Sequence, residues 1–138
     1  MKEEVRVAII VNPHLPIGLM ANTIGAVSIG LGAKRPGLGG SKLTDLRGRT
    51  INVSSNRPVP ILQATYEEMA RLLLKAIAQA DDHTVVPFPS FARSLHDYAD
   101  YEAVFPSRDL AEETIDGLGI AGPSKWVKSL TGSLKLLR

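Results

Sequence analysis

Hydrophobic residues along this chain switch between the spacing typical of strands and the spacing typical of helices. The run from Val5 to Val11 is continuous, β-branched and aliphatic, which predicts a strand buried on both faces of a sheet. From Ile17 to Leu31 the apolar residues recur at steps of three and four, which predicts an amphipathic helix with one stripe against that sheet. Strands are also predicted at 61–64, 83–88 and 114–120. Strands and helices therefore alternate, which indicates an α/β fold.

A second helix is predicted directly after the second strand. Thr65 and Glu68 have the spacing of a capping box, and the apolar positions that follow continue the helix to about Ala80. The segment 134–137 is expected to close the chain as a last short strand. Together these elements predict a single domain, 1–138, with a three-layer α/β/α architecture and a mixed, mainly parallel sheet of four to five strands.

One segment carries no regular pattern and is unusually rich in glycine. Gly32 to Gly48 combines glycine, proline and basic residues, so we expect a long loop there, mobile or involved in binding. Its glycines match neither G-x-G-x-x-G nor G-x-x-x-x-G-K-[ST], and they follow a helix where both motifs need a preceding strand. A nucleotide-binding fingerprint is therefore not expected. A short helix is predicted near 91–101, within an otherwise irregular stretch.

Composition narrows the classes of protein. The 138 residues are 44% hydrophobic and include no cysteine, which excludes disulfides, thiolate metal sites and a cysteine nucleophile. Two glutamates and a short β-branched run at the start indicate a strand rather than a signal peptide. No uninterrupted apolar run approaches the roughly 18–20 residues of a membrane span. We therefore expect a cytoplasmic protein with no membrane partner.

Neither charge nor histidine spacing identifies a partner. The formal net charge of +2 is too small to indicate a nucleic-acid-binding protein by itself. Lys125 and Lys128 belong to a basic C-terminal stretch, which we interpret as a solvated helix face, with a phosphate-contacting patch as the alternative. His14, His83 and His96 are far apart in sequence and lack ligand spacing, so no metal ion or cofactor is expected.

Polar residues follow two of the predicted strands at the point where each strand ends. Asn12 and His14 come directly after the first strand, and Asn22 lies one turn into the following helix. Ser90 and Arg93 follow the third strand in the same manner. Because the carboxyl ends of parallel strands meet at one edge of an open α/β sheet, we expect these side chains to converge on a ligand-binding crevice. Turn chemistry for Asn12 and helix capping for Ser90 form an alternative of equal weight.

Several stretches of the chain are similar to one known family. The opening reads VAIIVNPHLPIGLMANTIGAVSIGLGA, and the end reads TIDGLGIAGPSKWVKSLTGSLKLL, in which Thr131 to Leu136 is the most specific piece. Both resemble the type II peptidyl-tRNA hydrolases, and HTVVPFPSFARS falls where that family has its third strand and an aspartate-bearing loop. The stretch VNPHLPIGLMAN also resembles an uncharacterised bacterial branch of that superfamily, the domain-of-unknown-function family two thousand. The resemblance implies a type II peptidyl-tRNA hydrolase-like fold and, since those hydrolases self-associate, a homodimer.

The positions that carry catalysis in those hydrolases differ here. The resemblance places Leu19 where they have a lysine and Ser90 where they have an aspartate, while Thr114 keeps the place of a threonine. Leucine cannot hold a phosphate, and serine cannot act as a general base at neutral pH without a partner. The ordinary hydrolase mechanism is therefore not expected. Ser90, His14 and Thr114 stay as candidates for a different catalytic role.

Three functions remain open from the sequence. We favour a protein that binds a small ligand in the crevice without hydrolysing it, through Asn12, His14, Asn22, Ser90 and Arg93. An RNA-linked function, either tRNA binding or weak hydrolysis of a peptidyl-tRNA ester, is the first alternative. Hydrolysis or isomerisation of another substrate is the second.

Overall fold

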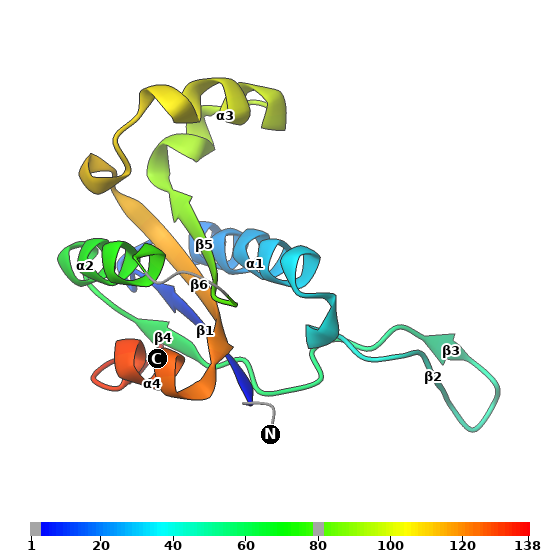
Figure 1. Ribbon diagram of the computed structural model, residues 1–138. Coiled ribbons are helices and arrows are strands. Elements are labelled where there is room, and N and C mark those ends of the chain that lie inside the picture. Colours follow the sequence, from blue (N-terminus) through cyan, green and yellow to red (C-terminus); the bar gives the residue numbers. More distant parts are fainter. Residues whose placement is uncertain (1–3, 79–81) are drawn as a thin grey trace.

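A five-stranded sheet forms the centre of the computed structural model, which describes residues 4–78 and 82–138 (Figure 1). The strand order across the sheet is β5-β6-β1-β4-β7. Its members are β1 (Val5–Val11), β4 (Ile61–Gln63), β5 (Thr84–Pro89), β6 (Ile115–Pro123) and β7 (Lys135–Leu136). The mixed α/β class and the number of strands agree with the pattern of the sequence.

The directions of the strands differ from the sequence-based prediction of a mainly parallel sheet, which is wrong. Only β1 and β4 run parallel, whereas β6 is antiparallel to both β1 and β5, and β7 is antiparallel to β4. The cause lies in the chain between β5 and β6, residues 90–113, which stays at one end of the sheet as a helical cap (Figure 1). Without a helix that crosses back over the face, the chain re-enters from the same edge and β6 must run antiparallel.

Helices pack on both faces of the sheet. On one face lies α1 (Ile17–Lys34), and on the other lie α2 (Tyr66–Ile77) and α4 (Ser124–Thr131). Successive residues of β1 point to opposite faces, so Ile9 joins the core under α1 while Ile10 joins the core under α2 and α4. The buried run that predicted β1 is therefore explained by helices on both sides.

Glycines in β6 allow α1 to lie unusually close to the sheet. A Cβ at Gly117 would collide with the Thr23 methyl group, and one at Gly119 would collide with Val27 and approach Leu31 Cδ1 to 2.8 Å. The glycine-rich sequence of this strand is thus a requirement of helix packing rather than of a turn.

The capping box at the start of α2 is confirmed. Thr65 Oγ1 accepts a hydrogen bond from the Glu68 backbone N–H at 3.2 Å, and the Thr65 N–H donates to Glu68 Oε1 at 3.0 Å. This reciprocal pair satisfies two backbone donors of the first turn. The helix ends at Ile77, and its predicted end near Ala80 lies outside the described residues.

The glycine-rich segment forms a hairpin rather than a structureless loop. Helix α1 continues to Lys34, a 3₁₀ turn η1 (Pro36–Leu38) follows, and β2 (Leu43–Thr44) pairs with β3 (Thr50–Ile51). The hairpin, residues 39–55, projects away from the sheet, and we call it the arm (Figure 1). The Asn56 amide donates to the carbonyls of Gly37 and Gly39, which closes the base of the arm.

The irregular stretch after β5 forms the cap, residues 90–113. It contains η2 (Ser90–Ser94), α3 (Tyr98–Val104), η3 (Phe105–Ser107) and η4 (Leu110–Glu112). Phe91, Tyr101 and Phe105 hold it together, with ring centroids 5.7 Å apart between Tyr101 and each of the two phenylalanines. The predicted short helix thus exists but begins later than expected.

Candidate functional site

A buried carboxylate, Asp116, lies at the start of β6, at the edge of the sheet where β1 and β5 end. Its side chain is 4% exposed. The Ser90 hydroxyl donates to Oδ1 at 2.7 Å, and the Tyr66 phenol donates to the same oxygen at 3.4 Å. Arg93 Nε donates to Oδ2 at 3.0 Å, forming an ion pair. Both carboxylate oxygens are therefore engaged, by two side chains from the turn after β5 and one from α2.

Arg93 connects this carboxylate to the first turns of α1. One terminal nitrogen donates to the Thr23 hydroxyl and to the Leu19 carbonyl, and the other donates to Asn22 Oδ1 at 3.4 Å. The guanidinium also lies over the Phe88 ring, 4.6 Å from its centroid. We call Asp116, Arg93, Ser90, Tyr66, Thr23 and Asn22 the strand-end cluster.

The structure brings together three of the five predicted ligand-binding residues, Asn22, Ser90 and Arg93. Asn12 is buried beside them, but its side chain accepts from the His14 backbone N–H at 2.8 Å. His14 is exposed and takes part in this turn through its backbone N–H. Thr114 offers its carbonyl to the Ser90 backbone N–H at 2.8 Å. The alternative of turn chemistry thus describes the contacts of Asn12.

Sequence reasoning missed Asp116 and Tyr66. Asp116 is the one charged residue in the apolar stretch from Ile115 to Ala121, within a predicted central strand. A charge at such a position must be paired when it is buried, which is the sign that could have identified it. Tyr66 gave no comparable sign, because its contact with Asp116 depends on how α2 meets β6.

The charged groups of the strand-end cluster interact with one another, through the Arg93–Asp116 ion pair and the effect of Asp116 on Tyr66. Burial raises the pKa of the Tyr66 phenol above its ordinary value, and the negative charge of Asp116 raises it further. The Asp116 carboxylate accepts hydrogen bonds from a guanidinium and two hydroxyl groups, so both of its oxygens are engaged within the protein. The arrangement holds α1, α2 and β6 together at this edge.

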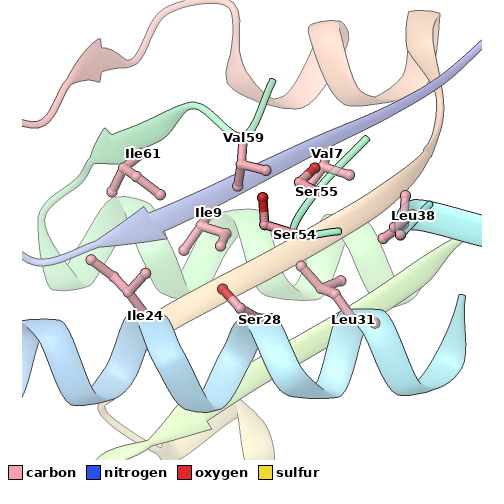
Figure 2. A pocket seen from close by; sticks show the side chains of 12 residues that line it. Val7, Ile9, Ile24, Ser28, Leu31, Leu38, Ser54, Ser55, Val59 and Ile61 are labelled. Carbon is pink, nitrogen blue, oxygen red and sulfur yellow. The ribbon is translucent and has the colours of Figure 1, made fainter. Parts of the chain in front are cut away.

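An apolar hollow lies elsewhere, between α1 and the extended segment 54–61, beside β1 (Figure 2). Its volume is about 440 Å³. Figure 2 shows Ile24, Ser28 and Leu31 of α1 on one side of it, with Val59 on the other. The remaining lining residues are Val7, Ile9, Gly32, Leu38, Gly39, Ser54, Ser55 and Ile61. Only serine hydroxyls and backbone groups give this lining polarity.

Among residues 4–78 and 82–138, no group of three or more histidine, aspartate or glutamate side chains is placed to hold a metal ion. The described residues define an α/β domain that contains a buried ion-pair cluster and an apolar hollow. The family model named protein of unknown function (DUF2000) matches residues 5–138, and the chain belongs to that family.

A solved structure has the same fold. It is that of a protein of unknown function from Agrobacterium tumefaciens, with a TM-score of 0.87 and 18% sequence identity over 99% of this chain and 98% of that one. No curated protein matches the sequence.

Proposed function

We propose that this protein binds a small, largely apolar molecule in the hollow between α1 and segment 54–61. The observation that carries the proposal is the hollow itself, whose 440 Å³ lies in the range of roughly 300–1,000 Å³ of small-molecule sites. Aliphatic side chains from β1, α1 and β4 would contact the body of the ligand. Hydroxyls of Ser28 and Ser54 would orient its few polar atoms.

The hollow is favoured over the strand-end cluster as the place of binding. A ligand at the cluster must compete with the bonds that Asp116 and Arg93 already make. A ligand in the hollow displaces water from aliphatic surface, which contributes roughly 25 cal/mol per Å² of buried area. We also propose that the protein binds this ligand in the cytoplasm.

Binding is tested with an apolar fluorescent probe, 1-anilinonaphthalene-8-sulfonate, followed by a library of small apolar molecules in a thermal-shift assay. Ser28→Phe fills the hollow and should abolish probe fluorescence and ligand-induced shifts. Ser129→Phe, at an exposed position of α4, is the matched control and should bind as the wild type does. Equal binding by both variants would contradict the proposal, and a loss only on Ser90→Ala would move the site to the strand-end cluster.

Ester hydrolysis is the second candidate, and with it the proposed kinship to the type II peptidyl-tRNA hydrolases. It is supported by the Asp116 carboxylate, which lies 2.7 Å from the Ser90 hydroxyl, and by Arg93 beside Leu19. A carboxylate and a cation thus stand near the positions where the resemblance puts an aspartate and a lysine. Turnover of a peptidyl-tRNA that falls on Ser90→Ala would favour this candidate. Absence of turnover by the wild type would exclude peptidyl-tRNA as the substrate.

A further inference from the structure

Most of the surface of α1 is apolar and exposed. Three residues of this 18-residue helix are buried, Thr23, Val27 and Leu31, while Ile17 is 85% exposed and Ile29 is 75% exposed. By length and composition alone the helix is apolar enough to cross a membrane, and just 17% of its residues are buried inside the protein. It carries no charged residue before Lys34. An exposed helix face normally carries charges, so this face is suited to a partner.

The outward face of α1 is also unusually smooth. It consists of Gly18, Ala21, Asn22, Gly25, Ile29 and Gly32, which we call the outer stripe. A Cβ at any of its three glycines would meet no atom of this chain within 4 Å, so packing within the chain does not require them. Glycine weakens a helix but lets another backbone approach closely. The outer stripe therefore has the shape of a contact between helices.

Opposite charges lie at the two ends of α1. The arm and its base, residues 34–57, carry six basic residues and one acidic residue at the C-terminal end of the helix. The cap, residues 90–113, carries six acidic residues and two basic ones, and Arg93 anchors it to the N-terminal turns of the helix. Figure 1 shows the arm projecting from the C-terminal end of α1 and the cap beyond the end of β5.

We propose that the partner of the outer stripe is a second copy of this chain, with the two α1 helices packed antiparallel about a two-fold axis. An antiparallel pair places the C-terminal end of each helix beside the N-terminal end of the other. The basic arm of each protomer then lies against the acidic cap of its partner, twice in one dimer. The contact is isologous and closed, as most homodimer interfaces are.

The arm supplies the remaining apolar surface of this contact. Leu43, Leu46 and Ile51 lie on it, and Leu46 is 95% exposed. At about 3.3 Å per residue, the eight residues from Gly40 to Arg47 reach about 26 Å, close to the length of about 27 Å expected for an 18-residue helix. The arm can therefore extend across the partner. The proposal does not require a ligand in the hollow, although Gly32 belongs to both the lining of the hollow and the outer stripe.

The first experiment measures the mass of the protein across a concentration series by sedimentation velocity. The wild type should be a dimer that dissociates on dilution. Ile29→Glu and Gly25→Leu should each raise the dissociation constant at least about 30-fold, the effect of losing an interface hot spot. Leu74→Glu, at an exposed position of α2, is the matched control and should leave dimerisation unchanged. A wild type that stays monomeric at every concentration would overturn the proposal.

The second experiment tests the contact between arm and cap by charge reversal. One variant carries Lys42→Glu and Arg47→Glu on the arm, and the other carries Asp100→Lys, Glu102→Lys and Glu112→Lys on the cap, which makes the arm net acidic and the cap net basic. Each variant alone brings like charges together and should be monomeric. Mixed, they pair opposite charges at both contacts, so native mass spectrometry should detect a heterodimer. Two variants that dimerise alone, or that fail to pair when mixed, would refute this arrangement.

A lipid surface is the competing occupant of the outer stripe, and Gly25→Leu separates the two. This change makes the stripe more apolar but blocks close helix packing. It should therefore abolish the dimer without promoting binding to vesicles of phosphatidylcholine and phosphatidylserine. A monomeric wild type that sediments with the vesicles, with stronger binding by Gly25→Leu and weaker binding by Ile29→Glu, would assign the stripe to lipid instead.

Discussion

At the scale of single residues, Asp116 and Arg93 are the most consequential pair in the molecule. The carboxylate is nearly inaccessible to water, and the guanidinium bonds to it and to α1 at once. A buried charge that loses its partner keeps its desolvation cost without the compensating attraction. The pair is therefore a point where one substitution affects β6, α1 and the cap together.

Asp116→Asn should lower the free energy of unfolding by about 3–5 kcal/mol, because it removes the buried counter-charge of the partly buried Arg93. Urea denaturation followed by circular dichroism measures the change. Arg49→Met breaks the exposed pair with Asp45 and serves as the control, with no measurable effect expected. Equal effects of the two substitutions would show that the buried pair has no special role.

Tyr66 gives the stability of the protein a dependence on alkaline pH. Because the pKa of its phenol is raised in the folded state, its contribution to stability is complete below the unfolded pKa of about 10 and is lost as pH rises through the folded value. Tyr66→Phe removes the hydrogen bond to Asp116, and with the phenol it also removes the decrease in stability at alkaline pH. The stability difference between wild type and variant should therefore be constant below about pH 9 and shrink as pH rises above about 10. A constant difference, measured by urea denaturation at each pH, would contradict the assignment.

At the scale of elements, the close approach of α1 to β6 depends on glycine in the strand. Gly119→Ala should cost about 1–3 kcal/mol, because its methyl group would have to displace Val27 and Leu31. Gly37→Ala is the matched control, since a Cβ there meets no atom within 4 Å. Thermal unfolding of the two variants should differ by several degrees. Equal melting temperatures would mean that the helix can shift without cost.

The elements that sequence reasoning found are those with local causes. The capping box of α2 depends on Thr65 and Glu68, three residues apart, and was predicted correctly. The direction of β6 depends on how the cap turns the chain, and the position of Tyr66 depends on the packing of α2, so neither could be derived from local pattern. Asp116 was missed although its apolar neighbours mark a buried charge. The hollow was missed because its walls come from α1, β1 and segment 54–61, which are distant in sequence.

At the scale of the whole molecule, the sheet and the arm are structurally separate. The arm pairs only within itself and at its base among the described residues, through the Gly39–Ser55 bridge and the Asn56 amide. Its exposed leucines and isoleucine contribute nothing to either described core cluster. The shape of the arm therefore depends on its own turn, where the Asp45 carboxylate accepts hydrogen bonds from the backbone N–H groups of Arg47 and Arg49.

Deleting residues 41–53 and joining the ends with a short glycine linker should leave a cooperative thermal transition in calorimetry. The bridge at the base already holds the two ends together, so the loop closure costs little. The same deletion should abolish the dimer, because it removes the basic arm. Loss of the cooperative transition would show that the arm is part of the folding core.

The pairing of the first strand with the last long one has a consequence for synthesis of the chain. Val5 pairs with Pro123, and β6 supplies the neighbour on one whole side of β1. On a ribosome that adds about 5–20 residues per second, β1 therefore waits on the order of ten seconds for this neighbour to emerge. During that time the edge of β1 that β6 later covers has unpaired backbone groups and is open to chaperones.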